Sequence, residues 1–288
     1  MQIAYLASQV TLPGSPTRRP DAYEHDQMIE ALAGPLDAIG YGLDAVSWDD
    51  ERADWSRYGA VIIGTTWDYW DRQALFLATL ERIERQTRLF NPAALVRWNS
   101  HKGYLRELAD KGSRTIPTLW VDKATPEAVA AGFEALGSQD VVWKRQVGAG
   151  AAGQYRLSPG DRVPDMPHAM MAQPFLPAIQ TEGELSFIFV GGAFCHALIK
   201  KAVAGDYRIQ SAYGGVETAV VPSEADLAAA ASVLALLDEA PLYARVDMVR
   251  DKDGGLLLME LELIEPFLYP LQGPKLGPIM ADAIKRRL

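Results

Sequence analysis

Three carboxylates lie on two neighbouring segments near the C-terminal end of the chain. Glu260 and Glu262 are two residues apart, so on a strand they share one face, and the other face takes Met259, Leu261 and Leu263. The turn-forming residues 253–255 separate this strand from another, 244–249, which carries Asp247. We therefore expect a hairpin that places Asp247 near the two glutamates. Three carboxylates on one half-buried face repel each other, and a bound cation with all-oxygen ligands, such as Mg²⁺, would compensate for them.

A lysine and a glycine-rich stretch follow the predicted strand 141–144. Lys144 ends this strand, and Gly148, Gly150 and Gly153 come soon after it. Such a loop can turn its backbone N–H groups toward a phosphate, and the lysine adds a positive charge. A flexible surface turn after an edge strand is the alternative interpretation, which the motif alone does not exclude.

Further cations are set among predicted strands and at the start of a helix. Lys102 lies near the beginning of a helix expected from Asn99, where the helix dipole disfavours a cation unless it faces an anion. A solvated surface lysine is the alternative. A cluster of cations beside three carboxylates is what a polyphosphate with Mg²⁺ requires, and the chain offers Lys200, Lys201, Arg208 and Arg245.

Two uncharged or aromatic segments are further candidates for ligand binding. Trp67, Asp68 and Tyr69 follow the strand 60–64 at its carboxyl end, where α/β sheets bind ligands, although the aromatic rings could equally pack a domain interface. The segment 171–177 is apolar with a proline break. It is either a core strand with a turn or a hinge whose backbone binds a purine edge.

Composition excludes several classes of protein. The net charge of −9 argues against a nucleic-acid or anionic-membrane partner. Cys195 is the single cysteine, so an intramolecular disulfide is impossible. The first residues lack the pattern of a signal peptide, and no apolar run reaches the roughly 20 residues of a membrane span. We expect a cytoplasmic protein without a nucleic-acid or membrane partner.

The elements that must position these residues alternate in type along the chain. Strands at 2–7, 43–46 and 60–63, with helices at 23–39 and 73–86, predict a small α/β domain. A Gly-x-Gly-x-x-Gly motif does not follow its first strand, which argues against a dinucleotide site. Later strands predict an α+β part with more antiparallel pairing: 116–121, 141–144, 170–175, 184–190 and 194–200. Helices are expected to begin at Thr125 and to cover 223–237 and 279–288.

Taken in order, these signals resemble the ATP-grasp superfamily, and within it the glutathione-synthetase-like and ribosomal-modification-ligase-like branches. They are most similar to the O-ureido-serine cyclo-ligases of cycloserine biosynthesis. The resemblance covers essentially the whole chain. It implies an α/β and α+β fold in which two ATP-grasp subdomains grip ATP behind a small Rossmann-like domain. The implied domains are a pre-ATP-grasp domain at 1–97, a lid subdomain at 98–172 and a large subdomain with the metal site at 173–288.

The resemblance also implies roles for individual residues. The ATP phosphates would contact Lys102 and Lys144 beneath a lid with Gly148, Gly150 and Gly153. The adenine hinge would be formed by Gln173, Phe175 and Leu176, and the ribose would be held by Glu184. Mg²⁺, as one or two ions, with Mn²⁺ as an alternative, would be bound by Asp247, Glu260 and Glu262. Phosphoryl transfer would be assisted by Lys200, Arg208 and Arg245, and the acceptor would be bound by Trp67, Asp68 and Tyr69.

The chain departs from the family pattern at three positions. Glu262 replaces the usual asparagine of the metal strand, which adds a charge and bears on the number of ions. Ser186 stands where related ligases often have a basic residue, which argues against a glutathione-like acceptor. Arg145 replaces the more usual proline after Lys144.

These observations predict an ADP-forming carboxylate ligase that acts through an acyl phosphate on a small amino-acid-like substrate. An amine-type nucleophile would capture the acyl phosphate, and intramolecular cyclisation stays open. One alternative is a ligase that adds an amino acid to a peptide or protein. Another is an ATP-binding regulatory module without turnover. The expected partners are the carboxylate and amine substrates, and a homodimer is left open.

Overall fold

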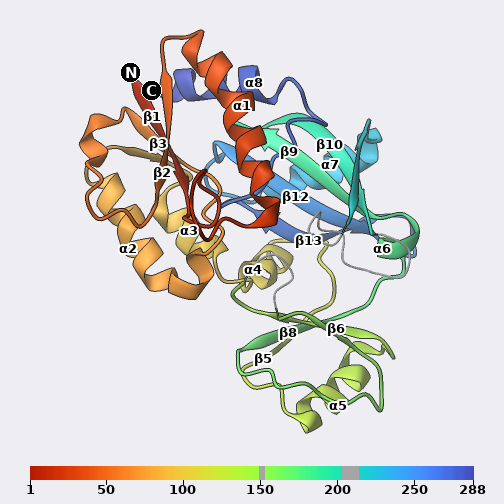
Figure 1. Cartoon of the computed structure of the whole chain (residues 1–288). Helices are drawn as coiled ribbons and strands as arrows, with labels where there is room; N and C mark the ends of the chain where they lie inside the picture. The colour runs from red at the N-terminus through yellow and green to blue at the C-terminus, as the bar shows by residue number, and fades with distance from the viewer. Residues whose placement is uncertain (149–152, 203–213) are drawn as a thin grey trace.

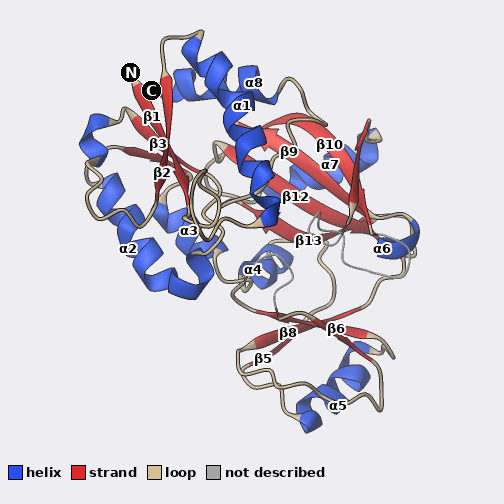
Figure 2. Ribbon diagram, in the orientation of Figure 1, coloured by secondary structure: helices blue, strands red, loops and turns tan. Residues whose placement is uncertain are grey.

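The computed structural model describes residues 1–148, 153–202 and 214–288, and three β-sheets organise this part of the chain (Figures 1 and 2). The first sheet is parallel, in the order β2-β1-β3-β4. Its strands are β1 (Gln2–Ala7), β2 (Gly42–Ser47), β3 (Ala60–Ile63) and β4 (Arg88–Phe90). The α/β organisation predicted for this part is confirmed. Sequence reasoning missed β4, because a strand this short shows no alternation.

Helices cover both faces of the parallel sheet: α1 (Tyr23–Asp37), α2 (Gln73–Glu84) and α3 (Ala93–Asn99). Successive residues of a strand point to opposite faces. Ile3 and Tyr5 of β1 accordingly lie in a core with α1, whereas Ala4 and Leu6 lie in a core with α2 and α3. The loops between these elements contain single 3-10 turns at Pro20–Ala22, Trp55–Arg57 and Tyr69–Arg72.

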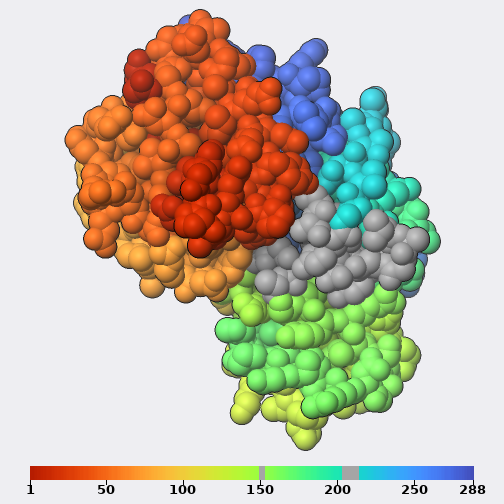
Figure 3. Space-filling view, in the orientation of Figure 1, coloured from red at the N-terminus to blue at the C-terminus, as the bar shows by residue number. Residues whose placement is uncertain are grey.

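The second sheet forms a lobe that projects from the rest of the molecule, coloured green in Figure 3. It is antiparallel, in the order β5-β8-β6-β7, and it packs against α5 (Pro126–Leu136). The Thr125 hydroxyl accepts a hydrogen bond from the Ala128 N–H at 3.2 Å, which caps the start of α5 as expected. The strands are β5 (Leu119–Val121), β6 (Val141–Arg145), β7 (Tyr155–Leu157) and β8 (Met170–Pro174).

The third sheet is antiparallel and has five strands in the order β11-β10-β9-β12-β13. One face is apolar and packs against α4 (Tyr104–Asp110) and α7 (Glu224–Leu234). The short α6 (Ala178–Thr181) precedes its first strand. The strands are β9 (Glu184–Val190), β10 (Ala193–Lys201), β11 (Val216–Val220), β12 (Tyr243–Arg250) and β13 (Leu256–Glu262).

The predicted acidic hairpin is confirmed as the β12–β13 pair, in which Asp247 lies opposite Glu260. The face predicted for Met259 was wrong. The register of the β12–β13 pair shifts between Asp247 and Met248. Met248 pairs with Leu258, which leaves Met259 as an extra residue in a β-bulge. Met259 therefore packs in an apolar cluster with Val249, on the same side of the sheet as the carboxylates.

Side chains from the end of α3 and the start of α4 cover the outer edge of β13. The Asn99 amide donates to the Leu261 carbonyl at 2.8 Å and accepts from the Leu263 N–H at 3.1 Å, while the Tyr104 hydroxyl accepts from the Leu261 N–H at 3.0 Å. Asn99 was expected to begin a helix but ends α3, and Lys102 lies in the turn before α4. The edge is thereby closed to pairing with other chains.

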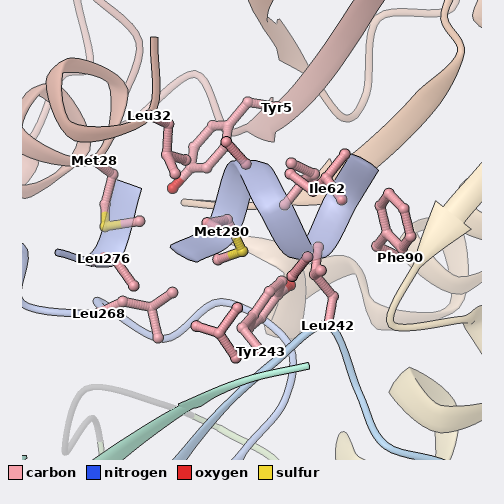
Figure 4. Packing of buried hydrophobic residues seen from close by; sticks show 14 of the residues in the cluster. Tyr5, Met28, Leu32, Ile62, Phe90, Leu242, Tyr243, Leu268, Leu276 and Met280 are labelled. Atoms are coloured by element: carbon pink, nitrogen blue, oxygen red, sulfur yellow. The ribbon is translucent and has the colours of Figure 1, made fainter. Parts of the chain in front are cut away.

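The C-terminal helix α8 (Leu276–Arg287) joins the first and third sheets. Leu276 and Met280 pack with Met28, Leu32 and Tyr5 (Figure 4). Helix α8 follows the third sheet in sequence, yet it shares a core with α1 of the first part of the chain. The division into domains at 97/98 and 172/173 therefore stays a prediction. Among the residues that the structure describes, no helix has the length and apolarity needed to cross a bilayer.

Gly277 allows α8 to approach α1 closely. A Cβ atom at this position would lie 2.0 Å from the Ala31 carbonyl oxygen, so the two helices would have to separate. We expect Gly277→Ala to lower the free energy of unfolding by about 1–3 kcal/mol, measured by urea denaturation. Gly34→Ala in α1 is the control, because no atom other than those of its chain neighbours and of its own helix backbone lies within 4 Å of its Cβ position. The gain of roughly 0.5–1 kcal/mol from replacing a helical glycine is opposed by Pro35, which disfavours helical backbone for an alanine before it. Gly34→Ala should therefore destabilise the protein less than Gly277→Ala, and equal losses would contradict this packing.

Candidate active site

A cavity of about 310 Å³ lies where the polar face of the third sheet meets the second sheet and loops of the first. It collects most of the predicted site residues, although they come from all three sheets. Those in its lining are Trp67, Tyr69, Lys102, Lys144, Gly148, Gln173, Phe175, Leu176, Glu184, Lys200, Arg245, Asp247, Glu260 and Glu262. Concave sites of this size that combine apolar and convergent polar groups are typical of small-molecule binding.

Four predicted residues are not brought into the cavity by the described structure. Asp68 accepts hydrogen bonds from the Trp48 indole at 2.7 Å and from Arg72 at 2.8 Å, so it stabilises the first domain. Gly153 (φ 68°) packs against the Arg145 side chain, outside the lining. Gly150 and Arg208 lie outside the described residues.

A buried network of charges occupies the floor of the cavity. Arg245 donates to both oxygens of Asp247 at about 3.0–3.1 Å and to the Phe267 carbonyl at 3.0 Å. Lys200 forms ion pairs with Glu184 and, at 3.4 Å, with Asp247. The structure thus favours Lys200 over its neighbour Lys201, which is exposed. Because successive residues of a strand face opposite sides, this choice follows from β10 itself.

The two remaining carboxylates of the predicted metal site are each paired with a cation. Glu262 contacts Arg245, and Glu260 contacts Lys102, whose side chain crosses from the turn before α4. Ser186 donates to Asp247, so the serine at this family position supports the carboxylate. Every partner lies on the same polar face of the sheet.

The balance between burial and neighbouring cations shifts the pKa values of these acids in different directions. Against the cost of burial, Arg245 and Lys200 lower the pKa of Asp247 to about 2. Burial raises the pKa of Glu184 to about 7 although Lys200 opposes it, and burial raises the pKa of Glu262 to about 7 against the effect of Arg245. The cations therefore keep Asp247 ionised but do not balance all three acids.

Lys144 is a positively charged side chain of the cavity that does not pair with any of these acids in the described structure. Its ammonium group lines the cavity and has no hydrogen-bond or ion-pair partner in the part of the chain that the structure describes. Burial lowers the pKa of Lys144, with only partial compensation from Glu260. A half-buried ammonium without a partner is a suitable contact for an anionic ligand group such as a phosphate.

The carboxylates supply the donor atoms of a magnesium site but do not form one in this arrangement. Within residues 1–148, 153–202 and 214–288, no group of three or more His, Cys, Asp or Glu side chains is gathered as metal ligands. Asp247 and Glu260 face each other in the register, and Lys102 and Arg245 hold the oxygens that a metal ion would need. All-oxygen donors suit Mg²⁺, provided that these cations move onto another anion.

One end of the cavity is apolar and fits a flat ring. Phe175 and Leu176 pack there with Ile116, Val249 and Met259. The Phe175 N–H donates to the Asp140 carbonyl at 2.8 Å, and the ring lies 3.5 Å from the Arg156 guanidinium. Sequence reasoning missed Val249 and Met259, because the bulge that turns Met259 inward leaves no mark in the hydrophobic pattern.

The opposite end of the cavity contains residues that the sequence did not indicate. They come from the loop before α1, the first turn of α1 and the segment after β13: Arg19, Asp21, Glu24, Glu265, Phe267 and Tyr269. Trp67 connects the two segments, since its indole donates to the Glu265 carbonyl at 3.2 Å. Trp67 therefore both packs a domain interface and lines the cavity. An acidic residue directly after the Glu260–Glu262 strand was the available signal for Glu265.

Solved structures share this fold over nearly the whole chain. The crystal structure of D-cycloserine synthetase DcsG matches with a TM-score of 0.83 and 27% identity, covering 100% of this chain and 99% of that one. The ATP-grasp ligase PsnB, in complex with a phosphomimetic variant of its minimal precursor, Mg and ADP, matches with a TM-score of 0.67 and 17% identity over 99% and 98% of the two chains. The predicted ATP-grasp fold is confirmed, and fold and site together define an ATP-grasp ligase.

Sequence comparison also relates the chain to a protein of cycloserine biosynthesis. The cycloserine biosynthesis protein DcsG of Streptomyces lavendulae is 31% identical over 269 residues, which cover 86% of this chain and 88% of that protein. Residues 3–91 also match the family described as the N-terminal domain of D-cycloserine synthetase DcsG. The chain belongs to the DcsG family of ligases.

The raised pKa of Glu184 makes stability depend on pH. The folded protein holds this proton more tightly than the unfolded chain, so stability is lost as the pH rises from about 4.5 to about 7. Wild-type protein without ligand should lose unfolding free energy across this window. Glu184→Gln, which has no proton to release, should gain about 1–3 kcal/mol on wild type between about pH 5 and about pH 8. Urea denaturation at the two pH values measures this, and parallel curves for the two proteins would contradict it.

Proposed function

We propose that the cavity binds MgATP and transfers the γ-phosphate to the carboxylate of a small amino-acid-like substrate, giving an acyl phosphate and ADP. An amine-type nitrogen then attacks the acyl carbon, phosphate leaves and a carbon–nitrogen bond forms. The unpartnered Lys144 ammonium, set opposite a surplus of carboxylates, carries this proposal. Support also comes from PsnB, whose structure holds Mg and ADP, and from the relation to D-cycloserine synthetase.

The nucleotide would span the cavity from its apolar end to the charge network. Phe175 and Leu176 would pack on the adenine and Gln173 would contact its edge, while Glu184 would accept from the ribose hydroxyls. Lys102 and Lys144 would neutralise the phosphates, beneath a lid that includes Gly148 and Gly153. Such a lid would exclude water from an acyl phosphate, which is prone to hydrolysis.

The predicted metal ligands fit Mg²⁺ once the nucleotide is present. Phosphate oxygens would draw Lys102 away from Glu260, leaving Asp247, Glu260 and Glu262 to bind one or two ions. The bound metal would neutralise charge on the phosphates. Glu262, in the place of the usual asparagine, would add a further negative charge and favour the higher metal occupancy.

The cations on the sheet would perform the positional part of catalysis. Lys200 and Arg245 are buried and fixed by their ion pairs, so their charges are already oriented toward a carboxylate that becomes an acyl phosphate. The planar guanidinium of Arg245 suits such a group. Arg208 would add a further cation.

The family relation favours a small acceptor within the same substrate, which is intramolecular cyclisation, over a peptide acceptor. A peptide ligase remains the second candidate, because PsnB was solved with its precursor. A regulatory module without turnover would have no need of the complete set of Lys102, Lys144, Lys200 and Arg245.

Calorimetric titration with a non-hydrolysable ATP analogue, with and without Mg²⁺, tests the nucleotide site. Magnesium-dependent binding is expected. ADP release is then measured with O-ureido-D-serine and with a panel of carboxylate and amine pairs. Folded protein that binds no analogue would refute the proposal, whereas binding without ADP release from any pair would favour the regulatory module.

Lys144→Ala should weaken binding of the ATP analogue by roughly tenfold to a hundredfold, because a charge-assisted contact to phosphate is lost. Calorimetry measures the dissociation constant. Lys123→Ala, at an exposed position of the same lobe, is the control and should bind as wild type does. Equal affinities for the Lys144 and Lys123 variants would remove Lys144 from the phosphate site.

Glu260→Gln should leave the protein folded and abolish Mg²⁺-dependent turnover, because it removes a charged metal ligand opposite Asp247. Thermal denaturation checks the fold, and ADP release across a magnesium titration measures the activity. A fully active Glu260→Gln protein with an unchanged magnesium requirement would show that the metal ligands lie elsewhere.

A further inference from the structure

Glu265 is a carboxylate in the cavity that the proposed chemistry leaves unused. It lies just after β13, and its main-chain carbonyl is held by the Trp67 indole at 3.2 Å. This contact fixes the backbone, while the side chain lines the cavity. Among the described residues, nothing donates a hydrogen bond or forms an ion pair to the Glu265 carboxylate.

The nearby cations are already committed to other acids. Arg245 is bound to Asp247 and Glu262, and Lys102 to Glu260. On the opposite wall, Arg19 is paired with Asp21 at 2.9 Å and its guanidinium lies 5.4 Å from the centre of the Trp67 ring. Among the described residues, these cations are therefore not free to act as a counter-ion for this acid.

The unpaired carboxylate is unfavourable in the empty cavity. Burial, followed by the charges of Glu262 and Glu260, holds the pKa of Glu265 well above its usual range. Either a proton or an uncompensated charge must be retained there. A ligand that carries a positive charge would let Glu265 ionise and would balance the charge of its carboxylate. A phosphate would balance the charge of Lys144 in the same way.

The position relative to Arg245 defines the kind of ligand. Arg245 and Lys200 would hold the carboxylate that is to be activated. Glu265 lines the same cavity, and the positive charge of Arg245 acts to lower the pKa of Glu265, so the two side chains lie within electrostatic range of each other. An α-amino acid carries its ammonium and its carboxylate on one carbon atom. A negative group beside a cationic carboxylate site therefore matches a zwitterionic amino acid.

We propose that Glu265 binds the α-ammonium group of the substrate and is a specificity-determining residue of this ligase. This inference rests on the proposed function.

A matched pair of substrates tests this role. ADP release is measured with MgATP and either O-ureido-D-serine or 3-(ureidooxy)propanoate, which lacks only the amino group. Wild type should have the lower KM for the amino compound. Glu265→Gln should raise that KM by roughly tenfold to a hundredfold and leave the KM values for ATP and the des-amino compound unchanged. Glu134→Gln, at an exposed position of α5, is the control.

The outcomes separate this inference from the proposed function. The role of Glu265 alone is overturned if wild type releases ADP with equal KM values for the two compounds. It is also overturned if Glu265→Gln keeps the lower KM of wild type for the amino compound. A changed magnesium requirement with the preference intact also overturns it, and makes Glu265 a metal ligand. If folded wild-type protein releases no ADP with any of the carboxylates tested, both the role of Glu265 and the proposed function are overturned. Thermal denaturation of Glu265→Gln should show no loss of stability, because repulsion from Glu260 and Glu262 is removed.

Discussion

The structure depends on balancing charge on one buried face of the antiparallel sheet. Among the described residues, Asp247, Glu184 and Glu262 share that face with Arg245 and Lys200, which pair with them. Arg245 is central, because it contacts two of the acids and a main-chain carbonyl at once. Breaking such a network would leave a buried charge without a partner, which is strongly destabilising. The surplus negative charge that remains is what gives the cavity affinity for cations and for a ligand that brings them.

The surrounding fold keeps these side chains at fixed positions. Antiparallel register sets Arg245 opposite Glu262 and Asp247 opposite Glu260, so the order of charges across the hairpin follows from backbone hydrogen bonds. Asn99 occupies the outer edge of β13 and prevents the strand from slipping or pairing elsewhere. Helix α8 then fastens the sheet to the N-terminal domain, whose Trp67 completes the cavity wall.

Lys144, which has no partner among the described residues, and the surplus of carboxylates come from different lobes, which links binding to the arrangement of the lobes. Lys144 lies on the projecting second sheet, whereas the carboxylates lie on the third. A phosphate chain that carries Mg²⁺ would satisfy both, the phosphate by its contact with Lys144 and the metal ion by its contact with the carboxylates, and it would hold the lobes together by contacts that neither lobe makes alone. Ligand binding to the folded state in this way also stabilises the protein against unfolding. Under the proposed function, the wall formed by Trp67 and by Glu265 of the segment after β13 would recognise the carboxylate substrate.

The sequence by itself determined most of the element types, the α/β-then-α+β order, the acidic hairpin and the cations that meet it, because these follow from hydrophobic period and residue type. Only the tertiary structure decided that Asp68 pairs with Trp48 and Arg72, that Met259 bulges inward and that Glu265 lines the cavity with no side-chain partner in the part of the chain that the structure describes. Periodicity specifies which face of an element is buried, but it does not encode which residues meet across elements, where a register shifts, or how an aperiodic loop folds back.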